Sequence, residues 1–337
     1  MSPIIGSRSI SCVAILLFIS ICTCCTEQSI AANVSNKSKR ELYPVEVDGK
    51  YGYMNKTGQI VIEPQFDGAS DFSEGLARIL VGDYETGRFG YIDTTGKIVI
   101  EPRFVGAGIF SEGLAAVDNG SRQGFIDKTG KYILSKTQDG KDLKDIVGYS
   151  EGLARITLDW KANHGPYDGF IDKAGKIVIP AKYHMAKNFS EGLAAVHENT
   201  DVPIHWGKDG YIDQKGQWVI KPQFYNANSF SEGFASVFVA RDKCGYIDKK
   251  GQWIIEPQYQ ECGGFSEGLA DVEINNQHGY IDRKGSVVIE AKYRRAWPFS
   301  GGLAQVETDG ADGIPQFGYI NNKGSYVWGP KPTSRFP

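Results

Sequence analysis

Residues 245–272, GYIDKKGQWIIEPQYQECGGFSEGLADV, belong to a pattern that recurs along the chain in eight related copies. The spacing between the glycines that open successive copies runs from 34 residues (Gly90 to Gly124) to 45 residues (Gly124 to Gly169). A period in this range is typical of proteins that stack one supersecondary unit many times. The opening glycines are Gly52, Gly90, Gly124, Gly169, Gly210, Gly245, Gly279 and Gly318.

The first half of each copy predicts a β-hairpin. Gly-Tyr-Ile-Asp is a short strand, and its Asp begins a turn that ends at a Gly three residues later, as in Asp248 to Gly251. An Asp or Asn side chain stabilises the start of such a turn, and the Gly accommodates a left-handed backbone. We therefore expect positive φ at the eight turn glycines, Gly58, Gly96, Gly130, Gly175, Gly216, Gly251, Gly285 and Gly324.

The second half of each copy predicts two more strands. An apolar β-branched run, such as residues 98–100, forms the return strand. We expect the Glu-Pro that follows in many copies to end this strand, because Pro has no N–H to donate. Leu-Ala-x-Val, as in residues 114–117, forms a third strand, and the short Gln-Phe-x-x-Ala segment before it is a candidate fourth.

A cut before each Leu-Ala-x-Val strand divides residues 42–328 into eight three-stranded β-meander units. The return strands are apolar on both faces, so each sheet needs a cover on both sides. Stacked blades of a propeller-like toroid provide that cover, and an open β-hairpin solenoid is the alternative. No apolar pattern with a helical period occurs over a useful length, so the predicted class is all-β.

The composition is that of a soluble globular chain with many turns. Apolar residues make up 41% and charged residues 23% of the 337 residues, which is ordinary. The 41 glycines exceed the usual share of about 7%, and the repeated turns explain them. A net charge of −3 without a basic stripe gives no reason to expect nucleic acid as a partner.

The eight copies resemble the WG-repeat family, also described as KWG repeats. The family pattern is roughly Trp-Gly-Tyr-Ile-Asp-x-x-Gly, an apolar strand and Phe-x-Glu-Gly-Leu-Ala, and the resemblance covers residues 42 to about 328. It implies a β-repeat, common on bacterial exported or surface proteins, and a binding role rather than catalysis. The Trp that names the family is replaced in this chain by Tyr51, Phe89, Gln123, Asp168, Asp209, Cys244, His278 and Phe317.

Residues 1–31 predict a secretory signal peptide. Arg8 precedes an apolar run over residues 13–21, and Ser29 and Ala31 fit a cleavage site. The run is shorter than a membrane-spanning helix needs. An uncleaved anchor, or a lipid anchor at Cys22, Cys24 or Cys25, is the alternative. Residues 32–41 are then a polar linker and residues 329–337 a tail, and we expect an exported protein that is periplasmic, secreted or on the cell surface.

Outside residues 1–31 the chain has two cysteines, Cys244 and Cys262, too few for a disulfide scaffold. Cys262 stands where other copies have a small residue such as Ala69. It is therefore either a buried small residue or the disulfide partner of Cys244, and their Cα separation decides between the two.

Polar residues that recur in nearly every copy are expected to serve the architecture. The Glu of Ser-Glu-Gly should accept backbone N–H groups in its own turn, and one copy has Gly301 instead. The five His show no metal spacing, and no nucleophile elbow or phosphate-binding loop occurs. We expect no catalytic residue, no metal and no cofactor. The recurring glutamates are Glu74, Glu112, Glu151, Glu191, Glu232 and Glu267.

Two variable loops in neighbouring units, over residues 157–168 and 197–209, are rich in aromatic and His residues. Neighbouring repeats contact one another, so the two loops should share one rim. Aromatic planes there would stack on a sugar or an extended peptide, and packing of each ring within its own loop is the alternative. The candidate binding residues are Trp160, His164, Tyr167, His205 and Trp206.

These patterns together predict a non-catalytic exported module that binds or scaffolds, with a cell-envelope glycan as the candidate ligand. A protein–protein interaction module at the cell surface is the alternative. An enzyme with a site in the centre of the toroid is a further one. Contact with a membrane is expected only through an N-terminal anchor.

Overall fold

The computed structural model describes residues 42–332 except residues 84, 162–164, 199–207 and 311–312. The predicted signal peptide and linker therefore lie outside the described residues. A compact unit begins at Leu42, and the elements described in it are all β-strands. None of the described residues form a helix long and apolar enough to cross a membrane.

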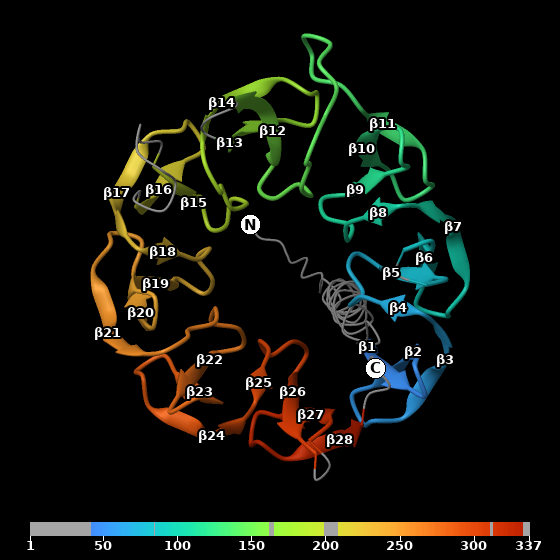
Figure 1. The fold of residues 1–337 in the computed structure, drawn as a ribbon, viewed down its shortest axis with the longest axis vertical. Coiled ribbons are helices and arrows are strands. Elements are labelled where there is room, and N and C mark those ends of the chain that lie inside the picture. The colour runs from blue at the N-terminus through green and yellow to red at the C-terminus, as the bar shows by residue number, and fades with distance from the viewer. Residues whose placement is uncertain (1–41, 84, 162–164, 199–207, 311–312, 333–337) are drawn as a thin grey trace, which may run out of the picture. The chain divides into compact units, whose positions relative to one another are not determined.

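Eight antiparallel sheets follow one another along the chain and close into a ring (Figure 1). We call them blades 1 to 8 in chain order. The all-β, propeller-like prediction is confirmed, and the open solenoid is not what forms. The blades are β1-β2-β3, β4-β5-β6-β7, β8-β9-β10-β11, β12-β13-β14, β15-β16-β17, β18-β19-β20-β21, β22-β23-β24 and β25-β26-β27-β28.

Every blade contains the three predicted strands, which lie side by side in chain order from the inside of the ring to its rim (Figure 1). Leu-Ala-x-Val forms β1 (Leu42–Val47), β5 (Leu76–Val81), β9 (Ala115–Asp118), β12 (Ala154–Lys161), β15 (Leu193–His197), β19 (Ala235–Ala240), β22 (Leu269–Ile274) and β26 (Leu303–Asp309). Gly-Tyr-Ile-Asp forms β2 (Lys50–Asn55), β6 (Arg88–Asp93), β10 (Gln123–Ile126), β13 (Gly165–Ile171), β16 (Asp209–Asp213), β20 (Lys243–Ile247), β23 (Gln277–Asp282) and β27 (Pro315–Asn321).

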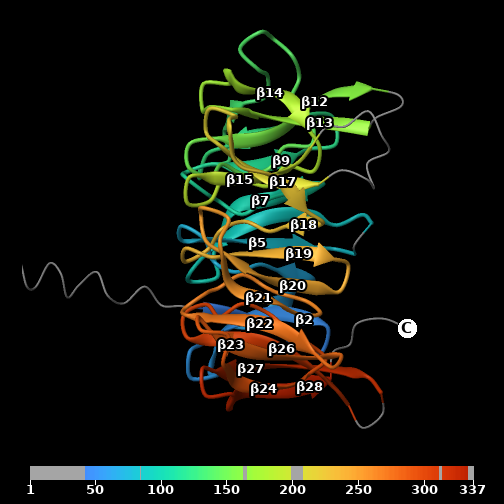
Figure 2. The ribbon, with the colours of Figure 1, turned by 90° about the vertical axis from the view of Figure 1, so that its left-hand side faces the viewer.

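The outermost strand of each blade is β3 (Ile60–Phe66), β7 (Ile98–Phe104), β11 (Tyr132–Leu134), β14 (Ile177–Tyr183), β17 (Trp218–Phe224), β21 (Trp253–Tyr259), β24 (Val287–Tyr293) or β28 (Tyr326–Pro332). The candidate fourth strand is real but short. It is innermost in four blades, as β4 (Gly68–Ala69), β8 (Gly106–Ala107), β18 (Asn226–Ala227) and β25 (Arg295–Ala296). In Figure 2, which views the ring from its edge, the outer strands run along the rim from one blade to the next.

The prediction that Glu-Pro ends the return strand is wrong. β7 continues through Pro102 to Phe104, where Phe89 is its partner on β6. Proline is tolerated because β7 is an edge strand and bulges at this point. The bulge also explains the opening glycine, since a Cβ on Gly90 would lie 2.7 Å from the Pro102 nitrogen.

The turn prediction is confirmed. All eight glycines of the Asp-x-x-Gly turns have positive φ, between 73° at Gly216 and 88° at Gly96. At Gly251 the N–H donates to the Asp248 carbonyl at 2.9 Å, and the Asp248 side chain accepts the N–H groups of Lys250 and Gln252.

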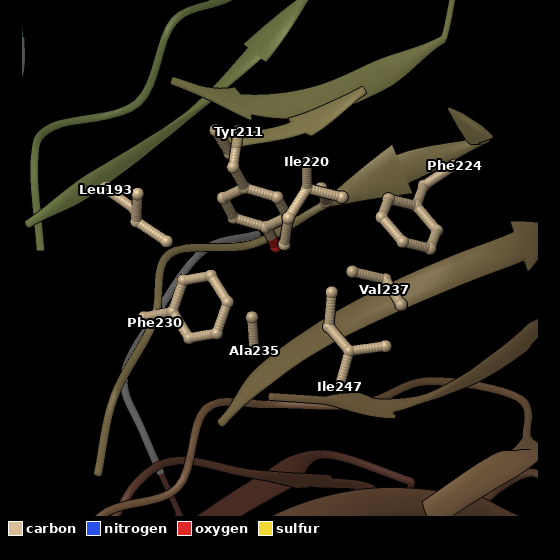
Figure 3. Close-up of a cluster of buried hydrophobic side chains, with 10 residues drawn as sticks. Leu193, Tyr211, Ile220, Phe224, Phe230, Ala235, Val237 and Ile247 are labelled. Atoms are coloured by element: carbon tan, nitrogen blue, oxygen red, sulfur yellow. The ribbon is translucent and has the colours of Figure 1, made fainter. Parts of the chain in front are cut away.

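The hydrophobic core is a set of clusters, most of them lying between two neighbouring blades. Figure 3 shows the cluster between blades 5 and 6, in which Leu193, Tyr211 and Ile220 of blade 5 meet Val237 and Ile247 of blade 6. Because both faces of a blade are buried in this way, one blade would expose two apolar faces on its own. The ring is therefore the unit that buries the apolar surface.

The ring closes where blade 8 meets blade 1. Tyr43 and Val45 of β1 share a core cluster with Leu303 and Tyr319 of blade 8. The Tyr319 hydroxyl donates to the Pro44 carbonyl at 2.9 Å, and the Tyr43 hydroxyl donates to the Gly301 carbonyl at 2.8 Å. We call this contact the seam.

Candidate functional site

The position at which the WG-repeat pattern has its Trp faces the next blade. In blade 4 the Asp168 carboxylate accepts the Ala186 N–H of blade 5 at 2.9 Å. In blade 5 the Asp209 carboxylate accepts the Ala227 N–H of blade 6 at 2.8 Å. In blade 2 the aromatic Phe89 occupies this position and packs against the cluster that it shares with blade 3. The Trp position is thus a joint between blades, and its chemistry differs from joint to joint.

In blade 6 the contact with the next blade is a covalent bond. Cys244 of β20 forms a disulfide with Cys262, whose Cα lies 6.1 Å away and which pairs with Val272 in blade 7. Of the two readings of Cys262, the disulfide is the one that the structure shows.

The residue opposite the Trp position on the neighbouring strand completes each joint. It is hydrogen-bonded to the Trp-position residue in blade 3 (Gln123 to Asp118, 3.1 Å), blade 4 (Thr157 to Asp168, 3.0 Å) and blade 5 (His197 and Asp209, 2.7 Å). The internal hydrogen bonds of these polar pairs compensate the cost of taking the groups out of water.

A pocket of about 300 Å³ lies at the seam, between blades 8 and 1. Its aromatic walls are Tyr51, Trp297, Phe317, Tyr319 and Trp328. The ring centres of Trp297 and Phe317 are 5.9 Å apart, and those of Tyr319 and Trp328 are 6.5 Å apart. The lining also contains acidic, basic and amide side chains that can form hydrogen bonds, namely Glu46, Arg295, Gln305, Glu307 and Lys331.

Phe317, which holds the Trp position of blade 8, lines this pocket. Blade 1, on the other side of the seam, has three strands over the described residues, as blades 4, 5 and 7 do.

The pocket contains a tyrosine hydroxyl that stays protonated and charged side chains that are already paired. Burial raises the pKa of the Tyr319 hydroxyl far above its ordinary value, so this group stays a neutral donor to the Pro44 carbonyl. Glu307 is 4% exposed and pairs with the Arg294 guanidinium at 3.3 Å. The Lys331 ammonium lies 5.0 Å from the centre of the Trp328 ring.

The structure describes only a small part of the predicted rim. His164, His205 and Trp206 lie outside the described residues, and of Trp160 only the backbone is described, paired with Pro166. Tyr167 is 5% exposed, and its ring centre is 4.4 Å from that of His184. The rim of Trp160, His164, Tyr167, His205 and Trp206 stays a prediction, in which Tyr167 contributes a buried support rather than an exposed plane.

Sequence reasoning missed the seam pocket. Two signals point to it in retrospect. The first is that Gly301 replaces the Glu of Ser-Glu-Gly only in the last blade, and the second is that Phe317 occupies the Trp position there. Neither signal shows that residues near the two ends of the array meet.

Comparison with known proteins gives a family and a fold. A family profile described as WG containing repeat matches residues 51–84, 89–122, 169–199, 210–240, 245–277 and 279–310. No curated protein matches this chain.

Two solved structures are similar in fold alone, because their sequence identity is low. One is described as the crystal structure of the eukaryotic initiation factor, with 11% identity and a TM-score of 0.53, over 86% of this chain and 95% of that one. The other is the β-propeller domain of the Trilobed protease from Pyrococcus furiosus, with 10% identity and a TM-score of 0.50, over 79% and 99%.

Proposed function

Because this chain belongs to the family of WG containing repeats, we propose that it is a non-catalytic binding module whose ligand occupies the seam pocket. The ligand class is a glycan of the cell envelope. The pocket carries the proposal, since it combines five aromatic walls with carboxylate, guanidinium, amide and ammonium groups.

The chemistry of the pocket suits a saccharide. The C–H faces of a sugar ring are apolar and pack on aromatic rings such as those of Trp297 and Phe317. The hydroxyl groups at the edge of the same ring need donors and acceptors, which Arg295, Gln305 and Glu307 supply. The size of about 300 Å³ is at the lower end of small-molecule sites and suits one or two sugar residues.

A binding role is also supported by the use of the recurring carboxylates. Burial raises the pKa of Glu112, but hydrogen bonds from the Gly152 N–H and the Lys173 ammonium outweigh burial, so its pKa lies below the ordinary value. Glu74, Glu191 and Glu232 are held in the same way. Groups held as carboxylates by the architecture are poor general acids at neutral pH.

Export is part of the proposal, and the disulfide between Cys244 and Cys262 supports it. Disulfides persist in oxidising compartments and are rare in the cytosol. The N-terminal pattern of residues 1–31 points the same way.

Titration calorimetry of the full chain with soluble peptidoglycan fragments and a panel of envelope oligosaccharides tests the proposal. Phe317→Gln introduces the residue that blade 3 has at the same position, Gln123, so the fold should persist. We expect Phe317→Gln and Trp297→Ala each to weaken binding about tenfold or more, which corresponds to about 1.4 kcal/mol.

Two further variants locate the site. Tyr225→Ala removes an aromatic ring that is 49% exposed and lies outside the pocket, so it should bind as the parent does. A Trp160→Ala, Trp206→Ala double variant tests the predicted rim. Loss of binding in this double variant with full binding in Phe317→Gln would move the site to the rim. Absence of any glycan binding would favour a protein partner.

A further inference from the structure

The joint of blade 7 differs from the other polar joints. His278 occupies its Trp position on β23, and Glu273 on β22 is its cross-strand partner. Among the described residues no hydrogen bond or ion pair joins these two side chains, unlike the pairs in blades 3, 4 and 5. Nδ1 of His278 is buried and has no hydrogen-bond partner, and the residue is only 9% exposed.

A third group reaches the same place. Glu261 lies on the innermost segment of blade 7, where its carbonyl accepts the Glu273 N–H at 2.9 Å. One ligand atom from each of Glu261, Glu273 and His278 lies within 4.8 Å of the other two. Residues opposite each other on paired segments point to the same face, which is why these three side chains converge.

We propose that Glu261, Glu273 and His278 form a binding site for a divalent first-row transition metal ion such as Zn²⁺. Two carboxylates and one neutral imidazole are a ligand set for such an ion, and their charge of −2 balances it. Without a cation, two carboxylates lie close to an imidazole whose buried Nδ1 lacks a hydrogen-bond partner, which is an unfavourable arrangement. An ion satisfies all three groups at once.

The backbone around the site is held in place before any ion binds. Gln260 and Asn276 are joined by two hydrogen bonds of 3.1 Å. Gln260 Nε2 donates to Asn276 Oδ1, and the backbone N–H of Asn276 donates to Gln260 Oε1. Cys262, the residue after Glu261, is fixed by its disulfide to Cys244. These contacts lie on both sides of Glu261 and limit the ordering that metal binding must supply.

The other blades provide substitutions that remove the ligands and respect the fold. Blade 2 has Gly68, Leu80 and Phe89 where blade 7 has Glu261, Glu273 and His278. His278→Phe and Glu273→Leu therefore import a combination that already packs in this architecture. Glu290→Gln, an exposed carboxylate on β24 of the same blade, is the matched control.

The experiment is calorimetric titration of Zn²⁺ into the untagged full chain, with the melting temperature measured with and without Zn²⁺. We expect one site whose dissociation constant rises at least tenfold in His278→Phe and in Glu273→Leu and is unchanged in Glu290→Gln. The Zn²⁺-dependent rise in melting temperature should disappear in the same two variants. A visible absorption spectrum of the Co²⁺ form should report imidazole coordination in the parent and lose it in His278→Phe.

Two outcomes would overturn the proposal. One is Zn²⁺ binding by folded His278→Phe and Glu273→Leu as tight as that of the parent, which would assign the ion to other surface groups. The other is a parent protein that shows neither binding nor a shift in melting temperature at millimolar Zn²⁺. If His278→Phe fails to fold, Glu273→Leu and Glu261→Gly give the same test.

Discussion

The carboxylate of Glu112 in blade 3 accepts the N–H of Gly152 in blade 4, forty residues later, at 3.0 Å and 3.2 Å to its two oxygens. The same bond links Glu74 to Gly113, Glu151 to Gly192, Glu191 to Gly233, Glu232 to Gly268 and Glu267 to Gly302. The expectation that each Glu serves its own turn is therefore wrong, because the acceptor belongs to one blade and the donor to the next.

These glutamates also adopt a left-handed backbone. Glu112 has φ of 54° and is followed by Gly113 with φ of 85°, and Ser111 and Leu114 exchange two backbone hydrogen bonds around them. This is a type I′ turn, in which Asn is the preferred first residue. A Glu there is strained, but its longer side chain reaches the neighbouring blade. Blade 8 has Gly301 at this place, and its carbonyl accepts from Tyr43 of blade 1.

The first prediction concerns acid stability. The pKa of Glu112 is lower in the folded protein than its ordinary value of 4.5, so its contribution to stability is present above pH 4.5 and is lost as the pH falls through the folded pKa. We expect Glu112→Gln to melt at a lower temperature than the parent at pH 7, and the difference to shrink as the pH falls below 4.5. Calorimetric melts across this range measure it. Glu290→Gln, which replaces an exposed carboxylate on β24, is the control variant.

The second prediction concerns the hairpin turns. Gly251 has φ of 80°, and a Cβ there would lie 3.3 Å from Ile220 Cγ2 of the preceding blade. We expect Gly251→Val to lower the free energy of unfolding by about 1–3 kcal/mol, because a β-branched residue is strained at positive φ. Gly251→Asn meets the same neighbour but tolerates this backbone better, so it should cost less. Denaturant unfolding compares the two, and equal losses would contradict the backbone explanation.

The third prediction concerns the disulfide. Replacing both Cys244 and Cys262 by Ala should destabilise the protein by about 2–4 kcal/mol, since the cross-link no longer restricts the unfolded chain. A Cys244→Phe, Cys262→Ala variant copies the Phe89 and Ala107 joint of blade 2 and should recover part of this loss through packing. Thermal melts with and without a reductant give the measurement. If the melting temperature of the parent protein is unchanged by the reductant, the disulfide does not stabilise the fold.

The fourth prediction concerns ring closure. Tyr319→Phe removes the hydrogen bond across the seam to Pro44 and should cost about 0.5–1.5 kcal/mol. Tyr280→Phe removes the equivalent bond to the Trp297 carbonyl between blades 7 and 8. Phe125 and Phe170 stand at this position in blades 3 and 4, so both variants should fold. Similar losses of unfolding free energy in denaturant titrations would show that the seam hydrogen bond stabilises the ring as much as the equivalent bond between blades 7 and 8. A negligible loss for Tyr319→Phe alone would show that it does not.

The sequence by itself determined the repeating unit. Asp-x-x-Gly turns, apolar β-branched runs and Leu-Ala-x-Val depend on interactions within a few residues, so every turn glycine and the three strands of each blade were predictable. The apolar character of both strand faces also predicted blades stacked in a ring. The end of the return strand at Glu-Pro was misjudged, because Pro is excluded from central strands but tolerated at an edge, and position within the sheet is a tertiary property.

Only the tertiary structure decided what lies across each joint. Glu112 and Gly152 are 40 residues apart, and Tyr319 and Pro44 are 275 apart, so no local pattern connects them. The seam pocket brings Phe317 and Trp297 of blade 8 together with Glu46 and Tyr51 of blade 1. Glu261, Glu273 and His278 converge because the segment before β22 pairs with β22 next to the cross-strand neighbours Glu273 and His278. A repeated sequence specifies the identical parts of each blade, whereas the closed ring determines which of its variable residues meet.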